Sequence, residues 1–146
     1  MPQTDRRMPA MSPWLKWPVA DKVRQPGVYV LAHLIKPPSG PADHTHQNVV
    51  YIGESSKPLH IRWRAFHRSA QQKDRRSHSG GRTYFGKFND IDPALHVAWL
   101  LLEEQHPSLL AAQIKYWERR LLLEFAERRR AEGSTESSLL PLCNKS

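Results

Sequence analysis

The sequence predicts an α/β domain in which a small three-stranded sheet, mixed or antiparallel, is flanked by helices in the order β-β-α-β-α. Two β-rich segments lie in the first third of the chain, at residues 26–35 and 48–53. Apolar residues recur at helical spacing over residues 58–72 and 107–131. A length of 146 residues fits one compact domain with a modest core.

Residues 1–24 are rich in proline and charge, so we expect an irregular leader ahead of a domain at residues 25–146. The large aromatics of this leader, Trp14 and Trp17, could dock on the domain. A turn signal at Gln25-Pro26-Gly27 precedes a strand at residues 28–35.

The segment at residues 36–47 is predicted to be a loop, because it contains Pro37, Pro38, Gly40 and Pro41. The strand at 48–53 then pairs most simply antiparallel to the first.

A helix is predicted at residues 58–72, with Ser55 or Ser56 able to cap it and Pro58 suited to its first turn. Residues 73–82 are polar and basic, and Gly80-Gly81 favours a mobile loop there. Residues 95–102 are a candidate third strand, although their leucine content also fits a helix. The last helix begins at Pro107 and runs to about Ala131.

The charge balance points to a polyanionic partner. With 22 Lys and Arg against 14 Asp and Glu, the net charge is +8. Nucleic acid is the commonest partner of a small basic protein, and a merely solvated basic surface is the alternative. The single cysteine, Cys143, excludes an intramolecular disulfide and a thiolate metal cluster. Because no apolar run approaches ~20 residues and no signal-peptide pattern opens the chain, we expect a cytoplasmic protein without membrane contact.

Glu118 is placed at the centre of an apolar stripe on the long helix. At about 100° per residue, several apolar side chains fall within roughly 60° of it: Ala111, Ile114, Leu121, Leu122 and Phe125. A carboxylate in such surroundings needs a partner. Two partners remain open, namely an arginine in a salt bridge or a hard divalent cation with further oxygen ligands.

The first helix carries an apolar stripe made of Leu59, Trp63, Phe66 and Ala70. Arg62 borders the stripe, where it could bury its stem and present its guanidinium to a phosphate; ordinary exposure is the alternative. His67 falls across the stripe, roughly 140° from Arg62, so it has either a functional role or a place on the helix flank.

Further basic residues are candidates for substrate contact. Arg64 lies on the far side of the first helix. Around Gly80-Gly81, a basic loop suits phosphate-backbone contact, or is simply solvated; its members are Arg75, Arg76, His78 and Arg82. His44 and His46 have no further spaced ligands, so they are poor evidence for zinc.

The order of these features resembles the GIY-YIG nuclease superfamily, and somewhat its restriction-type branch. Gly27-Val28-Tyr29 and Tyr51-Ile52-Gly53 correspond to its two naming tripeptides, with a Val that keeps the β-branched character of Ile. Leu59-His60-Ile61-Arg62 matches the context of the catalytic Arg, and Glu118-Arg119-Arg120-Leu121-Leu122 that of the metal-binding Glu. Pro141-Leu142-Cys143-Asn144 resembles the closing Pro-x-x-Asn.

The resemblance implies roles for these residues. Tyr29 would activate or orient water, Tyr51 would contact the scissile phosphate or a metal-bound water, and Glu118 would bind Mg²⁺ or Mn²⁺. Asn144 would brace the site, with an unstructured tail as the alternative. Gly53 would allow close backbone approach. The region that follows would face phosphate; it contains Ser55 and Lys57.

Two departures from the family pattern are visible. Many members have His or Tyr four residues after the Arg, a position that is Phe66 here, while His67 comes one residue later. The spacing between Tyr29 and Tyr51 is also longer than the family's usual short hairpin.

The expected function is a metal-dependent endonuclease that hydrolyses phosphodiester bonds in double-stranded DNA. The alternative is a catalytically degenerate DNA-binding module on the same fold. A homodimer would supply the second active site that a double-strand cut needs, and the sequence leaves the oligomeric state open.

Overall fold

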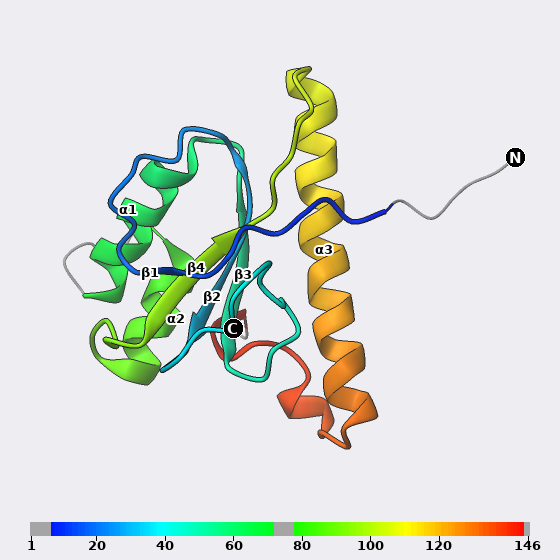
Figure 1. Ribbon diagram of the computed structural model, residues 1–146. Helices are drawn as coiled ribbons and strands as arrows, with labels where there is room; N and C mark the ends of the chain where they lie inside the picture. Colours follow the sequence, from blue (N-terminus) through cyan, green and yellow to red (C-terminus); the bar gives the residue numbers. More distant parts are fainter. Residues whose placement is uncertain (1–6, 72–77, 145–146) are drawn as a thin grey trace, which may run out of the picture.

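The computed structural model describes residues 7–71 and 78–144, and within them it is a mixed α/β fold with a four-stranded antiparallel sheet and three α-helices (Figure 1). The strands are β1 (Leu15–Lys16), β2 (Gly27–His33), β3 (Val49–Ser55) and β4 (Leu95–Trp99). The helices are α1 (Leu59–Ala70), α2 (Ser79–Phe88) and α3 (Pro107–Ala131). Two short 3-10 turns follow, η1 (Glu136–Ser138) and η2 (Leu142–Asn144).

The strand order is β1-β4-β2-β3, so β2 lies inside the sheet and β3 forms an edge. Tyr29 of β2 pairs with Gly53 of β3 and with Trp99 of β4. An irregularity next to Val50 shifts the register, because Leu31 pairs with Tyr51 while Ala32 pairs with Val49. Since side chains alternate between faces along a strand, Tyr29 and Tyr51 project from the same face of the sheet.

The sheet separates two apolar layers (Figure 1). On one face α3 packs against β2 and β3; this layer includes Val28, Val30, Ile52, Ile114, Trp117, Leu121 and Phe125. On the other face lie α1 and α2; this layer includes Trp17, Tyr29, Leu31, Leu59, Trp63, Phe66 and Tyr84. Residues 28–32 of β2 are fully buried, which explains why this strand has a continuous apolar run rather than an alternating one.

The predicted α/β class, with helices flanking an antiparallel sheet, is confirmed, and the predicted long helix has the same ends as α3. Residues 95–99 form a strand and not a helix. The prediction of three strands is wrong, because Leu15 pairs with Val97 and Lys16 with His96 to add β1. Two residues carry too little periodicity to be recognised as a strand without their partner.

The predicted mobile loop over residues 73–82 is wrong at its end, because α2 begins at Ser79. Gly81 packs so closely on α1 that an added Cβ would lie 2.7 Å from the Phe66 carbonyl oxygen and from the Ser69 Cβ. The glycine therefore allows two helices to approach each other rather than giving the chain freedom.

The segment expected as a leader contributes to both layers of the core. Met11 and Trp14 are buried on the α3 side, and Trp17 is buried against α1. None of the helices in the described part combines the length and apolar character needed to cross a bilayer.

The end of the chain closes the exposed edge of the sheet. The Asn144 side-chain amide accepts a hydrogen bond from the Ile52 N–H and donates one to the Ile52 carbonyl, each 2.8 Å long. An edge strand otherwise presents such groups unpaired. The tail is thus ordered through Asn144, and the amide holds the middle of β3 next to Tyr51.

We expect Asn144→Ala to lower the free energy of unfolding by about 1–2 kcal/mol, because two backbone groups of β3 lose their protein partner while water replaces part of the loss. Denaturant titration followed by circular dichroism would measure it. Leu142→Ala in the same turn is the control, since Leu142 is 46% exposed and its loss should change stability by less than about 0.5 kcal/mol. Equal effects of the two substitutions would show that the two hydrogen bonds between Asn144 and Ile52 do not stabilise β3.

Candidate functional site

Two tyrosines from neighbouring strands meet on the face covered by α1 and α2. The rings of Tyr29 and Tyr51 are 6.0 Å apart, and the Tyr29 ring packs edge-on against Trp63 of α1 at the same distance. Tyr29 is fully buried, whereas Tyr51 is partly accessible. The pair is therefore fixed by the sheet and reaches solvent through Tyr51.

Glycines leave room for the Tyr51 ring on two sides. A Cβ on Gly53 would lie 2.5 Å from Tyr51 Cε2 and 2.9 Å from the Tyr29 hydroxyl. A Cβ on Gly80, at the start of α2, would lie 2.6 Å from Tyr51 Cε1 and Cζ. Any other residue at either position would displace the ring, so these glycines define where the Tyr51 hydroxyl lies.

His78 joins the tyrosines through the N-terminus of α2. Its Nδ1 accepts the Gly81 N–H at 3.2 Å and so caps the helix, while its Nε2 lies 2.9 Å from the Tyr29 hydroxyl. A ring whose Nδ1 is an acceptor carries its proton on Nε2 when neutral, so these contacts assign His78 as the donor to Tyr29. Burial, followed by the charges of Arg62 and Arg82, lowers the pKa of His78 to about 3 and keeps the ring neutral.

Arg62 supplies positive charge to this cluster. It is half-buried on α1, and its charge acts on Tyr29, Tyr51 and His78. Burial raises the pKa of Tyr51 to about 12 and the pKa of Tyr29 well above its usual value, with Arg62 opposing both shifts. Both phenols therefore keep their protons at neutral pH, and Arg62 has the one fixed charge among the four groups.

Glu118 approaches from the α3 side, around the edge formed by β3. It is half-buried, and its charge acts on Tyr51. Burial raises the pKa of Glu118, and the nearby carboxylate of Glu54 raises it further. Lys115 pairs with Glu54 at 3.6 Å, and no ion pair to Glu118 is found within residues 7–71 and 78–144. The arrangement thus brings two carboxylates together at the edge of the sheet that β3 forms.

The prediction that Glu118 lies at the centre of the apolar stripe is wrong. The buried stripe of α3 consists of Ile114, Trp117, Leu121 and Phe125, while Ala111 is exposed. Glu118 lies on the flank of this stripe and is half-buried, whereas Leu121, near the centre of the stripe, is fully buried. On the flank, its carboxylate can meet solvent or a ligand.

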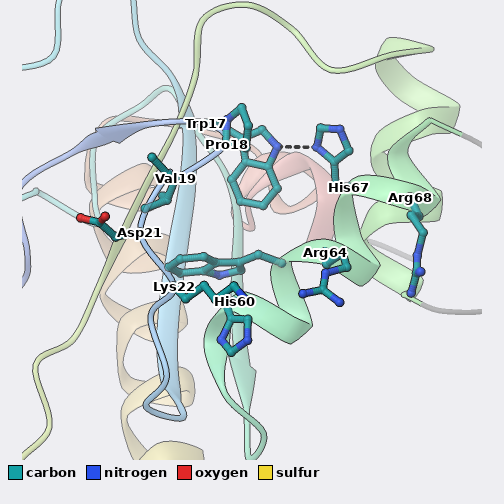
Figure 2. Close-up of a pocket in the computed structure, with 11 residues that line it drawn as sticks. Trp17, Pro18, Val19, Asp21, Lys22, His60, Arg64, His67 and Arg68 are labelled. Atoms are coloured by element: carbon teal, nitrogen blue, oxygen red, sulfur yellow. Dashed lines mark hydrogen bonds between the residues drawn. The ribbon is translucent and has the colours of Figure 1, made fainter.

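His67 is not brought to the tyrosines. Its Nδ1 accepts the Trp17 indole N–H at 2.9 Å, and the two rings are nearly parallel with centroids 6.1 Å apart (Figure 2). Arg64 lines the same surface pocket on the outer side of α1. Sequence spacing alone could not show that Trp17, fifty positions earlier, holds this histidine.

The other residues predicted to contact a substrate differ in their exposure and in the segment that carries them. Ser55 is buried, and its hydroxyl donates to the Lys57 carbonyl and accepts the Lys57 N–H, so it shapes the turn before α1. Lys57 and Arg82 are exposed. Arg75 and Arg76 lie outside the described residues.

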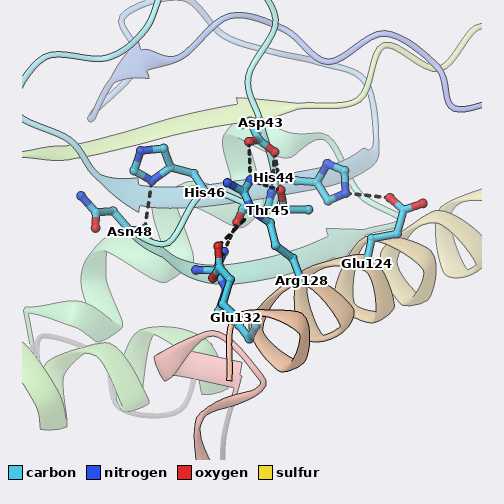
Figure 3. Close-up of polar contacts among 9 residues, drawn as sticks. Asp43, His44, Thr45, His46, Asn48, Glu124, Arg128 and Glu132 are labelled. Carbon is cyan, nitrogen blue, oxygen red and sulfur yellow. Dashed lines mark hydrogen bonds and ion pairs between the residues drawn. The ribbon is translucent and has the colours of Figure 1, made fainter. Parts of the chain in front are cut away.

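The two loop histidines have separate partners on the other side of the molecule (Figure 3). His44 Nε2 is 2.8 Å from Glu124 Oε1, whereas His46 Nδ1 accepts the Asn48 N–H. Nearby, Arg128 contacts Asp43 Oδ2 at 3.0 Å and the Thr45 hydroxyl at 2.7 Å. These contacts fasten the loop at residues 43–46 to α3. The described residues contain no group of three or more His, Cys, Asp or Glu side chains that could hold a metal ion by themselves.

Comparison with protein-family models, with curated proteins and with solved structures finds no match.

The sequence predicts only a basic loop around His78 and not its contact with the tyrosines. Its position directly before Ser79-Gly80-Gly81 is a weak signal, because histidine is not a preferred N-cap. The contact with Tyr29, 49 positions earlier, depends on tertiary packing.

We expect Gly80→Ala to destabilise the fold by about 1–3 kcal/mol, because the new Cβ overlaps the Tyr51 ring. Gly86→Ala in the same helix is the matched control: its Cβ meets nothing within 4 Å, so it should stabilise α2 by about 0.5–1 kcal/mol. Thermal unfolding of both variants would measure the contrast. A stable Gly80→Ala protein would show that Tyr51 is not confined.

A double-mutant cycle tests the bond between His78 and Tyr29. His78→Asn keeps a side chain that can cap α2 but is too short to reach Tyr29, and Tyr29→Phe removes the hydroxyl. We expect a coupling energy of about 1–2 kcal/mol in urea unfolding, because either change alone breaks the same buried hydrogen bond. Tyr84→Phe is the control partner, since Tyr84 contacts His33 at 2.7 Å instead. Additive effects in both cycles would refute the bond.

Proposed function

We propose that this protein is a metal-dependent DNA endonuclease of the GIY-YIG type. One observation carries the proposal: two neutral tyrosines and a guanidinium are packed together on one side of the β3 edge, and a carboxylate without an ion-pair partner among the described residues approaches Tyr51 from the other. Phosphoryl transfer needs positioned hydroxyls, a cation and a carboxylate that can hold a metal ion.

The residues at the edge fit a hard divalent cation. Glu118 and Glu54 offer carboxylate oxygens, and Mg²⁺ is usually bound by one or two carboxylates with substrate phosphate and water as the remaining ligands. When bound, Mg²⁺ or Mn²⁺ would polarise a phosphate oxygen and steady the leaving oxygen.

The side chains of the cluster would divide the remaining tasks. Arg62 would neutralise charge that develops on the phosphoryl oxygens. Tyr51, the more accessible phenol, would contact the phosphate. Tyr29 accepts from His78, so its own proton is directed elsewhere and its oxygen is held in place to orient the attacking water. With a raised pKa, Tyr29 serves better as an orienting group than as a base in the free protein.

A DNA substrate is supported by the net charge of +8 and by exposed basic residues around the cluster, among them Arg82 on α2. Contacts of this kind address the phosphate backbone and carry little sequence information. We propose double-stranded DNA as the substrate and a homodimer as the form that would cut both strands.

The second candidate function is a DNA-binding module without catalysis. The specific observation in its favour is His67, which pairs with Trp17 instead of joining the tyrosines. Such a module would use the same basic surface and would need no divalent cation.

Glu118→Gln tests the proposed activity. Incubated with supercoiled plasmid, the unaltered protein should nick or linearise it with Mg²⁺ or Mn²⁺ and not with EDTA, while the variant should be at least ~100-fold slower with unchanged DNA affinity, because it loses the metal and not the basic surface. Glu127→Gln, an exposed acid on the same helix, should cut normally. Metal-independent DNA binding without cleavage by the folded protein would favour the binding module.

The same variant should be more stable than the unaltered protein at neutral pH in the absence of metal. The folded-state pKa of Glu118 is raised, so its ionisation opposes folding, and this loss grows as the pH rises from about 4 to 7. Half of the side chain is solvated, so we expect less than about 1 kcal/mol. Melting temperatures of both proteins at pH 4 and 7 would check it; a larger gap at pH 4 would contradict the sign.

A further inference from the structure

Helix α3 carries a second row of apolar side chains, separate from the stripe that it buries against the sheet. Leu109, Tyr116 and Leu123 recur every seven residues and are 54%, 40% and 55% exposed. Ala112 and Ala126 each follow a leucine of this row by three residues. Side chains at this spacing form one continuous stripe on a helix. We call it the outer stripe, and its members are Leu109, Ala112, Tyr116, Arg119, Leu123 and Ala126.

The outer stripe points away from the rest of the fold. At about 100° per residue, its centre lies about 180° around α3 from the buried stripe. Figure 1 shows α3 covering its side of the sheet apart from α1 and α2, which lie on the other side. A row of large apolar side chains that a monomer leaves in water is typical of a surface that binds another chain.

The outer stripe is complementary in size to a second copy of itself. Two α3 helices can lie antiparallel about a two-fold axis that passes between residues 117 and 118. Leu109 of one copy then lies opposite Ala126 of the other, and Leu123 lies opposite Ala112, so each of these layers joins a large side chain to a small one. In the two central layers Tyr116 faces Arg119, which is a favourable pairing of an aromatic ring with a guanidinium.

The charges at the ends of α3 favour this antiparallel direction. Glu103 and Glu104 directly precede the helix, whereas Arg130 is exposed in its last turn. No ion pair involving these three residues is found within residues 7–71 and 78–144. In the antiparallel pair, Arg130 of one copy comes beside the glutamates of the other, and the helix dipoles oppose each other favourably. A parallel pair would bring like charges together at both ends.

We infer that the outer stripe of α3 binds the outer stripe of a second copy of this chain, in an antiparallel two-fold pair. The inference rests on the homodimer of the proposed function and names the surface that forms it. Glu118 lies about 130° around the helix from the centre of the outer stripe, so pairing leaves its carboxylate uncovered in both copies. The dimer thus has two accessible sites, as a cut in both strands requires.

New cysteines test the register of the two helices. In the double variant Leu109→Cys with Ala126→Cys, each new thiol meets its counterpart on the other copy, so oxidation should give a dimer on a non-reducing gel. The two positions of one chain are about 25 Å apart along α3, which prevents an internal disulfide. The natural Cys143 is buried and stays in place.

Leu109→Cys alone is the control for the cysteine experiment. The two copies of position 109 lie about 25 Å apart in the antiparallel pair, so this variant should remain a monomer on the same gel. A double variant that forms no disulfide dimer, or an equal yield of dimer from Leu109→Cys alone, would overturn the inference.

Sedimentation equilibrium without DNA or metal measures the association itself. The unaltered protein should be a dimer at about 50 µM, and Leu123→Glu should raise the dissociation constant at least ~100-fold, because the two-fold axis places the new charge in the interface twice. Ile61→Glu on α1 is the matched control, since Ile61 is 44% exposed on the other side of the sheet, and should change the constant less than ~2-fold. A monomer at every concentration, or equal effects of the two substitutions, would overturn the inference.

The outcomes separate this inference from the proposed function. A dimer that Leu123→Glu dissociates, without metal-dependent cleavage of DNA, would support the interface and count against the nuclease. Metal-dependent cleavage by a protein that stays monomeric would support the nuclease and overturn the interface. If the protein both pairs and cuts, Leu123→Glu should nick supercoiled plasmid normally and linearise it at least ~10-fold more slowly, because the second strand needs the second copy. Unchanged linearisation would overturn the interface as that of the active dimer.

Discussion

The ring of Tyr51 lies against Gly53 of its own strand and Gly80 of α2, and this close contact joins the parts of the molecule that form the site. It fixes how near α2 can come to the sheet, and therefore where His78 reaches Tyr29. Gly81 repeats the close approach one residue later, against the backbone of α1. Strand β3 and helices α1 and α2 therefore pack at distances that only glycine permits. Packing here serves to position polar groups, which distinguishes this layer from the apolar layer under α3.

The electrostatics of the site follow from that packing. Burial discourages charge on each of the two phenols and on His78, so the cluster contains polar but neutral groups around one guanidinium. Across the edge of β3, Glu118 and Glu54 place negative charge where solvent can still enter. The guanidinium of Arg62 lies on one side of β3, and the carboxylates of Glu118 and Glu54 lie on the other. The two sides of this strand therefore carry opposite charge. A phosphate with a divalent cation would complement both sides, which is the physical basis of the proposed nuclease.

Helix α1 contributes side chains to two surfaces of the protein. Its inner face carries Trp63 and Phe66 into the aromatic layer, while Arg62 faces the tyrosines and Arg64 the outer pocket. Trp63 is the wall between them.

Local pattern alone determined much of this protein: the ends of α3, most of the strand predicted at residues 28–35, and the apolar stripe of α1. The joint choice of Tyr29, Tyr51 and Arg62 came from the resemblance to a nuclease family. These features depend on periodicities of two and 3.6 residues, which are written in consecutive positions. Tertiary structure decided the rest. It added β1, moved Glu118 to the flank of its helix, gave His67 to Trp17 and brought His78 to Tyr29. Each of these outcomes depends on a contact between distant segments, whose energy no local periodicity records.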